Sequence, residues 1–231
     1  MTPSITILRR FCGPPDSANG GYAAGALARH VGGTVEVTLR RPVPLERPLE
    51  VVAESGRFFL RDGDDVVAEA RAAVLDAEVP APVTFDRACD ASAQSPIVVR
   101  PERHPFPGDF ACGTDREPGD GLRLFAGRVP GSDWYAVPWT PWPGAPVPDE
   151  IVWSALDSPS SFVIYLDDDS PPPHVLGRIT ARVDELPAPG VAHVIMSWRI
   201  ERSGRKTVAG SAIYRPDGTV CARARATWIA I

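Results

Sequence analysis

Two short stretches of the sequence carry residue types that could act together on a carbonyl compound. In "SANGGYAAGALAR" (17–29), Gly20 and Gly21 stand directly before small apolar residues at helical spacing. In "VWSALDSPSS" (152–161), Asp157 follows a largely apolar run, which predicts a partly buried carboxylate. Backbone N–H groups at the start of a helix polarise carbonyl oxygens, and burial raises the pKa of a carboxylate toward that of a useful general base.

Both stretches also have a purely structural explanation. Consecutive glycines form a tight turn into a buried helix, and Ser17 or Asn19 could cap that helix. Asp157-Ser158-Pro159 is also a good N-cap followed by a helical turn that begins at proline. The residue types alone leave both explanations open, so the choice depends on the elements that position the two stretches.

The composition argues against several classes of function. The chain has 231 residues, of which 44% are hydrophobic, and its formal net charge is −5. Basic residues are spread along the chain without a stripe that alternates with aromatics, which argues against nucleic-acid binding. No apolar run approaches the ~20 residues of a membrane helix, and no signal-peptide pattern follows Met1. We therefore expect a cytoplasmic protein that does not bind membranes.

The cysteines and histidines give no support for a metal site. Cys12, Cys89, Cys112 and Cys221 are widely separated, so we expect free thiols in a reducing compartment. The four histidines are equally scattered, and the common phosphate-loop, dinucleotide and nucleophile-elbow motifs are missing from the sequence. Cys112 has no histidine partner in its neighbourhood and is interpreted as a buried, unreactive thiol. We therefore expect neither a metal nor a cofactor.

Two β-hairpins of similar sequence indicate an internal repeat. "LRDGDDVVAEARAAVL" (60–75) resembles "YRPDGTVCARARATWI" (214–229). Each has a basic residue, an Asp-Gly turn and a following strand with the pattern Ala-x-Ala-Arg-Ala. Strands at 55–60 and 205–214 precede the two turns and complete the hairpins.

The same order of elements precedes both hairpins. A helical run at 19–31 lies in the first half, and another at 147–166 lies in the second. Alternating apolar and polar residues predict two strands between helix and hairpin, at 34–55 and at 177–201. We also expect opening strands before the helices, at 4–10, 121–129 and 133–139. One helix against an antiparallel sheet, formed twice, is an α+β fold.

Composition divides the chain into three segments. We expect an N-terminal repeat at 1–79, a Pro-rich linker at 80–119 and a C-terminal repeat at 120–231. The linker is weakly periodic and longer than most loops inside a compact domain, so we expect it to be ordered between the repeats.

This order and duplication resemble the tandem, or double, hotdog-fold acyl-CoA thioesterases of the thioesterase II type. The resemblance rests on 19–29, 37–51 and 64–72 in the first half, and on 119–127, 152–159 and 217–228 in the second. It implies two curved antiparallel sheets side by side, each wrapping one central helix. It also implies a substrate that is an acyl thioester of coenzyme A or of a carrier protein. Since hotdog pairs often associate again, we expect a homodimer or a higher homo-oligomer.

The resemblance also implies an oxyanion hole at the start of the first helix. The backbone N–H groups of Gly20, Gly21 and Tyr22, which follow Asn19, would face the thioester carbonyl. Glycine at these positions would let the substrate approach the backbone without a Cβ in the way. Asp157 stands where the family has its catalytic Asp on the second helix.

The family's helper residues are matched only in part. Thr180 is the candidate for the Thr that assists the catalytic Asp. The position of the family's Gln falls near Ala226 or Thr227, whereas the only glutamine of the chain, Gln94, lies in the linker. Thr227 could hold a water through its hydroxyl, although Thr in a strand is more often simply a good strand former.

Three functions can be compared on these grounds. The first is hydrolysis of an acyl thioester with Asp157 as base, and the second is binding of acyl-CoA or another hydrophobic acid without turnover. The incomplete helper set favours the second, whereas Asp157 and the glycine pair favour the first. A dehydratase or hydratase is disfavoured, because such enzymes pair an Asp with a His and the expected helices carry only His30, at the far end of the first.

Two further groups are candidates for contact with a substrate. Arg40, Arg41 and Arg47 lie near a strand bend and could meet the phosphates of coenzyme A, although surface arginines need no special reason. The aromatic cluster at 133–148 could line an acyl or adenine pocket, and it is equally well explained by packing.

Overall fold

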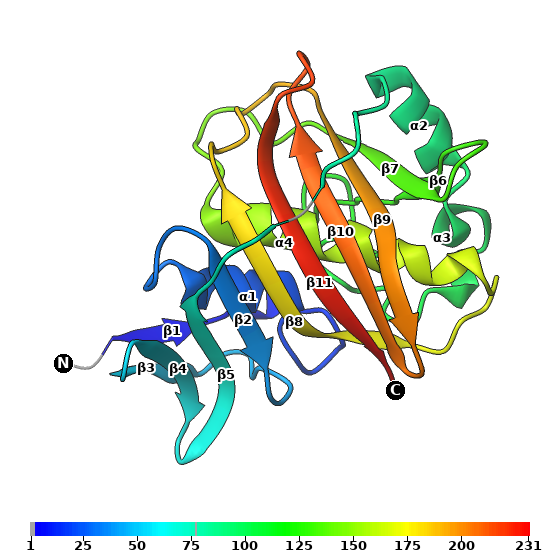
Figure 1. Ribbon diagram of the computed structural model, residues 1–231. Helices are drawn as coiled ribbons and strands as arrows, with labels where there is room; N and C mark the ends of the chain where they lie inside the picture. The colour runs from blue at the N-terminus through cyan, green and yellow to red at the C-terminus, as the bar shows by residue number, and fades with distance from the viewer. Residues whose placement is uncertain (1–2, 77) are drawn as a thin grey trace.

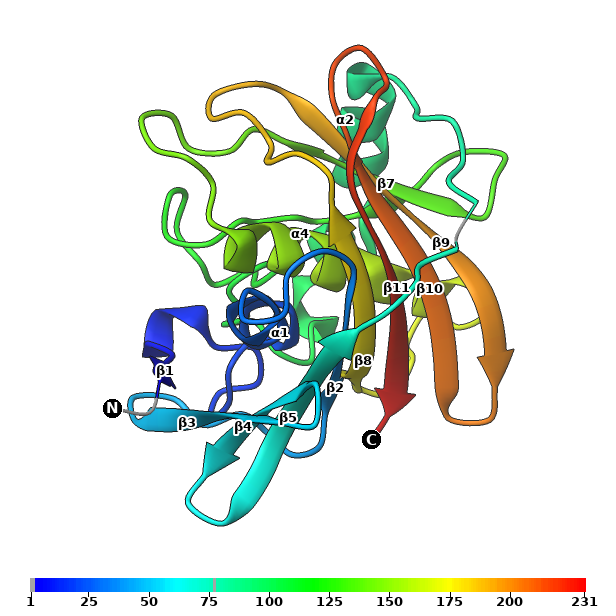
Figure 2. The same cartoon turned by 60° about the vertical axis from the view of Figure 1, so that its left-hand side comes forward.

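A computed structural model describes residues 3–76 and 78–231. Within these residues, eleven strands form one continuous sheet, and two main helices lie against one face of it (Figures 1 and 2). The strands of the first half are β1 (Ser4–Thr6), β2 (Val35–Leu39), β3 (Pro48–Glu54), β4 (Arg57–Asp62) and β5 (Asp65–Ala72). Those of the second half are β6 (Gly127–Arg128), β7 (Trp134–Trp139), β8 (His174–Val183), β9 (His193–Ser203), β10 (Lys206–Tyr214) and β11 (Val220–Ala230).

The two halves of the sheet have the same strand order. Across the sheet the order is β1-β3-β4-β5-β2, followed by β8-β11-β10-β9-β7-β6. Outward from the centre, β2, β5, β4, β3 and β1 are thus mirrored by β8, β11, β10, β9 and β7. Along the chain of each half, one main helix follows the opening strand and precedes the innermost strand. These helices are α1 (Gly20–Ala28) in the first half and α4 (Asp149–Ser161) in the second. The hairpins expected at the two Asp-Gly turns are confirmed as β4–β5 and β10–β11.

The expected pair of separate sheets is wrong, because the innermost strands of the two halves are hydrogen-bonded to each other. β2 runs antiparallel to β8, with Val35 opposite Ala181 and Val37 opposite Ile179. An unpaired edge strand exposes a row of backbone N–H and C=O groups, and this pairing satisfies those of both halves at once. The result is a single α+β sheet with a seam between β2 and β8.

The helices α1 and α4 pack closely against each other, because glycines remove side chains from their contact. A Cβ on Gly21 would lie 2.6 Å from both Asp157 Cβ and the Trp153 carbonyl oxygen. A Cβ on Gly25, one turn later, would lie 2.8 Å from the Glu150 Cα. Position 21 of α1 thus contacts position 157 of α4, and position 25 contacts position 150. Because the numbers rise in one helix and fall in the other, the two helices are antiparallel.

The segment between the halves contains two helices, of which the first packs on the outward face of the sheet and the second packs against the main core on the helix side through Ile97. It holds α2 (Phe85–Ala93), α3 (Pro96–Val99) and a short 3₁₀ turn, Pro101–Arg103. Two further 3₁₀ turns lie elsewhere, at Arg9–Phe11 and Phe162–Leu166. Ala88 and Ala91 of α2 form a small second core with side chains of β7, β9 and β10, such as Met196 and Tyr214.

The strand expected at 121–129 is confirmed only at Gly127–Arg128. The residues before it bond instead to the linker, where Leu122 N–H donates to the Phe110 carbonyl (2.9 Å) and Leu124 N–H to that of Ala111 (2.8 Å). No helix among the described residues has both the length and the apolar character needed to cross a membrane.

Candidate active site

The second half of α4 is fastened to the sheet by hydroxyl groups, and this places Asp157. Ser211 and Ser197, both fully buried on strands, donate to backbone carbonyls of α4 at 2.7 and 2.8 Å. The Trp228 ring N–H donates to Ser160 Oγ at 2.9 Å. Asp157 therefore lies in the interior of a helix, and the interpretation of Asp157 as the N-cap of a new helix is wrong.

Asp157 is a buried carboxyl group with one oxygen left free. Its side chain is 1% exposed, and Oδ2 accepts a hydrogen bond from Gly21 N–H at 2.8 Å. Oδ1 is buried and has no hydrogen-bond partner within residues 3–76 and 78–231. Burial raises the pKa of Asp157 well above its usual value; the charge of Asp109 adds to this, and the Gly21 hydrogen bond opposes it.

The three backbone N–H groups expected to form an oxyanion hole have different partners. That of Tyr22 donates to Asn19 Oδ1 at 3.0 Å, so Asn19 is the N-cap of α1. That of Gly21 donates to Asp157, as described above. The Gly20 N–H has no acceptor in the described part of the chain, and Gly20 lines a cavity. Only one of the three donors is thus free, and the missing side chain of Gly21 makes room for α4, not for a substrate.

A buried polar chain connects Asn19 to the linker. Asn19 Nδ2 donates to Asp109 Oδ2 at 3.0 Å and to Ser158 Oγ at 3.3 Å. Asp109 Oδ1 accepts the backbone N–H groups of Ala111 and Cys112 at 2.7 and 2.8 Å. Sequence reasoning missed Asp109 and Ser158. Ser158 adjoins the candidate Asp157, whereas Asp109 carries no signal in sequence, since its partner Asn19 lies 90 positions away.

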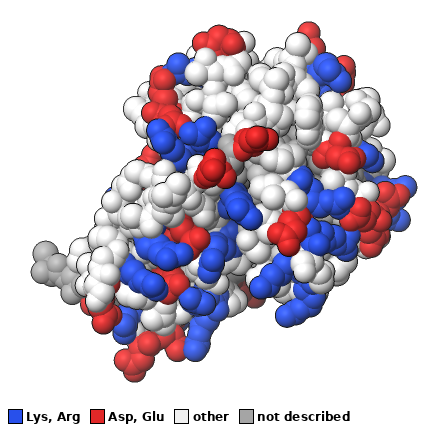
Figure 3. Space-filling model, viewed as in Figure 1, with Lys and Arg blue, Asp and Glu red and all other residues white. Residues whose placement is uncertain are grey.

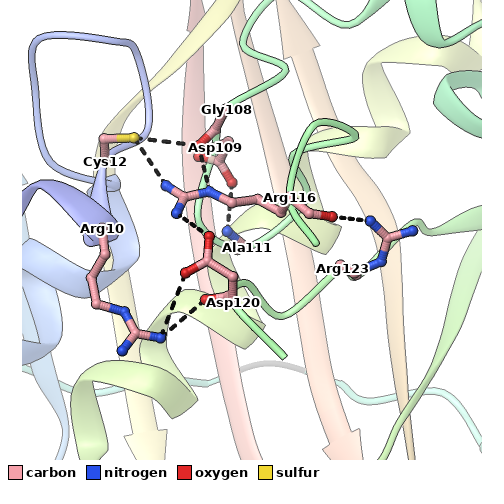
Figure 4. Close-up of polar contacts among 8 residues, drawn as sticks. All are labelled: Arg10, Cys12, Gly108, Asp109, Ala111, Arg116, Asp120 and Arg123. Carbon is pink, nitrogen blue, oxygen red and sulfur yellow. Dashed lines mark hydrogen bonds and ion pairs between the residues drawn. The ribbon is translucent and has the colours of Figure 1, made fainter. Parts of the chain in front are cut away.

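Arg116 holds the loop that presents Asp109 (Figure 4). Its guanidinium donates to the Gly108 carbonyl (2.9 Å), to Asp120 (2.8 Å) and to Cys12 Sγ (3.2 Å). Arg10 donates to the Asp120 backbone carbonyl at 3.1 Å. Because Arg10 and Cys12 belong to the segment that leads into α1, these bonds tie the linker to the chain just before that helix.

Asp157, Gly20 and this polar chain meet at one wall of a cavity of about 460 Å³. The other walls are mostly apolar and include Leu39, Ile97, Phe106, Phe162, Leu176 and Trp228. Arg40 and Arg41 also line the cavity, and both are exposed to solvent, so they mark its opening. They are ion-paired with Glu69 (2.6 Å) and Asp65 (2.8 Å).

Two other titratable side chains of the cavity, those of His104 and Cys112, are poorly suited to act as base or nucleophile. His104 Nδ1 accepts the Phe106 N–H at 3.1 Å and Nε2 lies 2.9 Å from the Cys112 carbonyl, so both ring nitrogens are engaged. Burial lowers the pKa of His104 and raises that of the Cys112 thiol well above its usual value. No three His, Cys, Asp or Glu side chains of the described residues are grouped to hold a metal ion.

Thr180 and Thr227 lie on the opposite face of the sheet. Ile179 and Ala181 belong to the core on the helix side, as do Ala226 and Trp228. Side chains alternate between the faces of a strand, so Thr180 and Thr227 point outward. There they stand opposite Glu36 and Arg178, on a surface with charged side chains of both signs (Figure 3). The structure therefore does not bring the expected helper residues to Asp157.

Comparison with known proteins identifies the fold. No family model and no curated protein matches the sequence. A hotdog-fold protein of unknown function from Alicyclobacillus acidocaldarius has a TM-score of 0.60 at 12% identity, over 99% of this chain and 91% of that one. An acyl-CoA thioesterase II from Mycobacterium marinum has a TM-score of 0.55 at 13% identity, over 98% and 91%. The dehydratase domain of RzxB from Pseudomonas fluorescens has a TM-score of 0.52 at 16% identity, over 91% and 85%. The expected likeness to thioesterase II-type hotdog proteins is confirmed, and at these identities what is shared is the fold.

Proposed function

We propose that this hotdog-fold protein hydrolyses acyl thioesters of coenzyme A or of a carrier protein, with Asp157 as the general base. One observation carries the proposal: Asp157, whose Oδ1 has no hydrogen-bond partner among the described residues, and Gly20, whose N–H has no acceptor there, both line the same apolar cavity. An unpaired buried carboxyl oxygen costs stability, so its retention in a cavity favours a functional role.

The geometry supports a simple hydrolytic sequence. The thioester carbonyl accepts the Gly20 N–H, and the acyl chain lies along the apolar walls. A water molecule gives one proton to Asp157 Oδ1 while its oxygen bonds to the carbonyl carbon. The tetrahedral intermediate then breaks its C–S bond. The proton held by Asp157 passes to the leaving sulfur, which gives a carboxylic acid and a free thiol.

The chain organisation proposed for this function is a double hotdog. The units are 1–79 and 120–231, and the Pro-rich linker 80–119 joins them. The matching strand orders of the two halves support this division. In this arrangement each unit contributes to the site: α1 and Gly20 come from the first, Asp157 from the second and Asp109 from the linker.

A non-catalytic acyl-binding module is the second candidate. It is favoured by the outward positions of Thr180 and Thr227 and by the position of Gln94, which is the C-cap of α2 outside the cavity lining. A dehydratase, which pairs an Asp with a His on one helix, is disfavoured, because the histidines of the cavity lining, His104 and His174, both lie outside α4.

The test measures hydrolysis of acetyl-, octanoyl- and palmitoyl-CoA with a thiol reagent. We expect turnover of at least one of them, and a loss of about 10²-fold or more in Asp157→Asn, the scale of a positioned general base. Asp149→Asn makes the same chemical change in the same helix, outside the cavity lining, and should keep the wild-type rate. Binding of these thioesters without turnover would favour the binding module, and full activity in Asp157→Asn would exclude Asp157 as base.

A further inference from the structure

We propose that the Ser158 hydroxyl is a second hydrogen-bond donor to the substrate carbonyl, and that Asn19 and Asp109 hold it in that role. The proposal rests on the proposed hydrolysis. It adds a catalytic residue, Ser158, and two positioning residues, of which Asp109 comes from the linker.

The orientation of the Asn19 side chain is fixed from both ends. Its Oδ1 accepts the Tyr22 backbone N–H, which can only donate. Its Nδ2 donates to the Asp109 carboxylate, which when ionised can only accept. The opposite orientation of the amide would set donor against donor at Tyr22 and acceptor against acceptor at Asp109.

This orientation determines what Ser158 can do. The second hydrogen on Asn19 Nδ2 is directed to Ser158 Oγ, at 3.3 Å, so the hydroxyl oxygen is already an acceptor. A hydroxyl has a single hydrogen to donate, and Ser158 donates to no oxygen or nitrogen in the described part of the chain. That hydrogen remains available to a ligand in the cavity, whose wall Ser158 forms.

The protein group that competes for this hydrogen is the Cys112 thiol. The Ser158 hydroxyl is among the groups that lower the pKa of Cys112, whose side chain is buried. Burial raises the pKa of Cys112 well above its usual value, so the group is a neutral thiol, a weak acceptor. A carbonyl oxygen that develops negative charge is a much stronger acceptor, so the hydroxyl would turn toward the substrate as the reaction proceeds.

Ser158 and Gly20 together then restore the two-donor arrangement that the backbone alone does not supply. Gly20 gives a free N–H at the start of α1, and Ser158 gives an O–H beside Asp157 on α4. Removal of one preorganised oxyanion donor costs roughly 10²–10³-fold in kcat. The same order of effect is expected here, with Asp109 and Asn19 acting through Ser158.

The test is a mutant cycle on the acyl-CoA that the wild type hydrolyses best. Ser158→Ala should lower kcat by about 10²-fold with a smaller change in KM. Asn19→Asp keeps an N-cap for α1 but offers Ser158 a carboxylate, which takes its hydrogen. It should lower kcat comparably, and the double variant should lose no more than the larger single loss. Ser154→Ala, whose hydroxyl bonds the Glu150 carbonyl at 2.9 Å, is the matched control and should keep the wild-type kcat.

The outcomes separate this proposal from the proposed function. If Asp157→Asn abolishes hydrolysis while Ser158→Ala keeps the wild-type kcat, Asp157 stands and Ser158 is not a donor. If the losses of Ser158→Ala and Asn19→Asp multiply in the double variant, Asn19 does not act through Ser158. If the wild type hydrolyses none of the three thioesters, the proposed function and this inference fail together. Thermal melts of each variant show whether a loss of kcat reflects a loss of fold.

Discussion

The two ends of the α1–α4 pair are built alike and carry different chemistry. At one end Gly21 of α1 faces Asp157 of α4, and the two are joined by a buried hydrogen bond of 2.8 Å. At the other end Arg29, just after α1, faces Glu150 in the first turn of α4, and the two form an ion pair of 3.0 Å. The Arg29 side chain is 51% exposed, whereas that of Asp157 is buried. The matching strand orders make these ends equivalent places in the fold.

The surroundings of the two ends differ as much as the contacts. The linker covers the Asp157 end, where Asp109 and the Arg116 hydrogen bonds close one side of the 460 Å³ cavity. The hollow at the Arg29 end has about 300 Å³, and polar groups such as Asp149, Asp184 and Glu185 line it. The fold thus provides two similar positions, and burial together with the linker makes one of them a candidate for catalysis.

The largest expected effect breaks the helix contact at the Asp157 end. The Cβ of Gly21→Ala would lie 2.6 Å from Asp157 Cβ and from a backbone oxygen, so α1 and α4 must separate. Overpacking of this kind costs roughly 1–3 kcal/mol, against a gain of ~1 kcal/mol in helix propensity. We expect a net loss of up to about 2 kcal/mol in a denaturant titration, together with at least a tenfold fall in kcat as Asp157 shifts.

Gly25→Ala supplies the matched control for this prediction. Its Cβ would lie 2.8 Å from the Glu150 Cα, toward the other end of the same contact. A similar loss of stability is expected, but kcat of the folded protein should stay within about twofold, because Asp157 keeps its place. Equal losses of kcat in both variants would mean that the glycines affect activity only through overall packing.

Much of the fold could be predicted from the sequence, because local patterns determine it. Asp-Gly turns with alternating strands predicted both hairpins, and small residues after Asn19 predicted α1. The joining of the halves into one sheet depends on which edge strands meet, β2 and β8, and no local pattern records that. The role of Gly21 is hidden for the same reason, since its contact lies on a helix more than a hundred residues away.

The candidate site, like the fold, could be predicted where a local pattern marks a residue and not where a distant contact determines its role. Asp157 could be predicted because an acid in an apolar helical run is unusual. Asp109 could not, because its importance comes from its contact with Asn19. The outward position of Thr227 was readable in principle. Thr227 lies an even number of residues from Arg223 and Arg225, so the three side chains share one face of β11. Ala222, Ala224 and Trp228 lie on the other, inward face.

An intermediate effect concerns the pH dependence of stability at the two ends. The pKa of Asp157 is higher in the folded than in the unfolded chain, so the folded state retains the proton over the interval between the two values. The free energy of unfolding should therefore fall as pH rises from the ordinary carboxyl pKa through the raised one. Asp157→Asn should lack this fall, and denaturant titrations at a series of pH values measure it.

At the other end, Asp149 gives the control. Partial burial raises its pKa as well, and the neighbouring Glu150 adds to the shift. Asp149→Asn should remove only a shallow part of the pH dependence, because this carboxyl group is exposed to solvent. A steeper change in Asp149→Asn than in Asp157→Asn would contradict the difference in burial between the two ends.

The smallest effect is expected from the ion pair at the Arg29 end. Arg29→Met keeps the length and the helix propensity of the side chain but removes its charge, and the pair is mostly exposed on the Arg29 side. Such pairs contribute about 0.2–1 kcal/mol, and salt screens them, so the loss of stability should be within this range and should shrink in 1 M NaCl. Hydrolysis should be unchanged, since Arg29 is not among the residues that line the Asp157 cavity. A tenfold fall in kcat would show that the two ends of the helix pair are coupled, and the assignment of catalysis to one end alone would then be wrong.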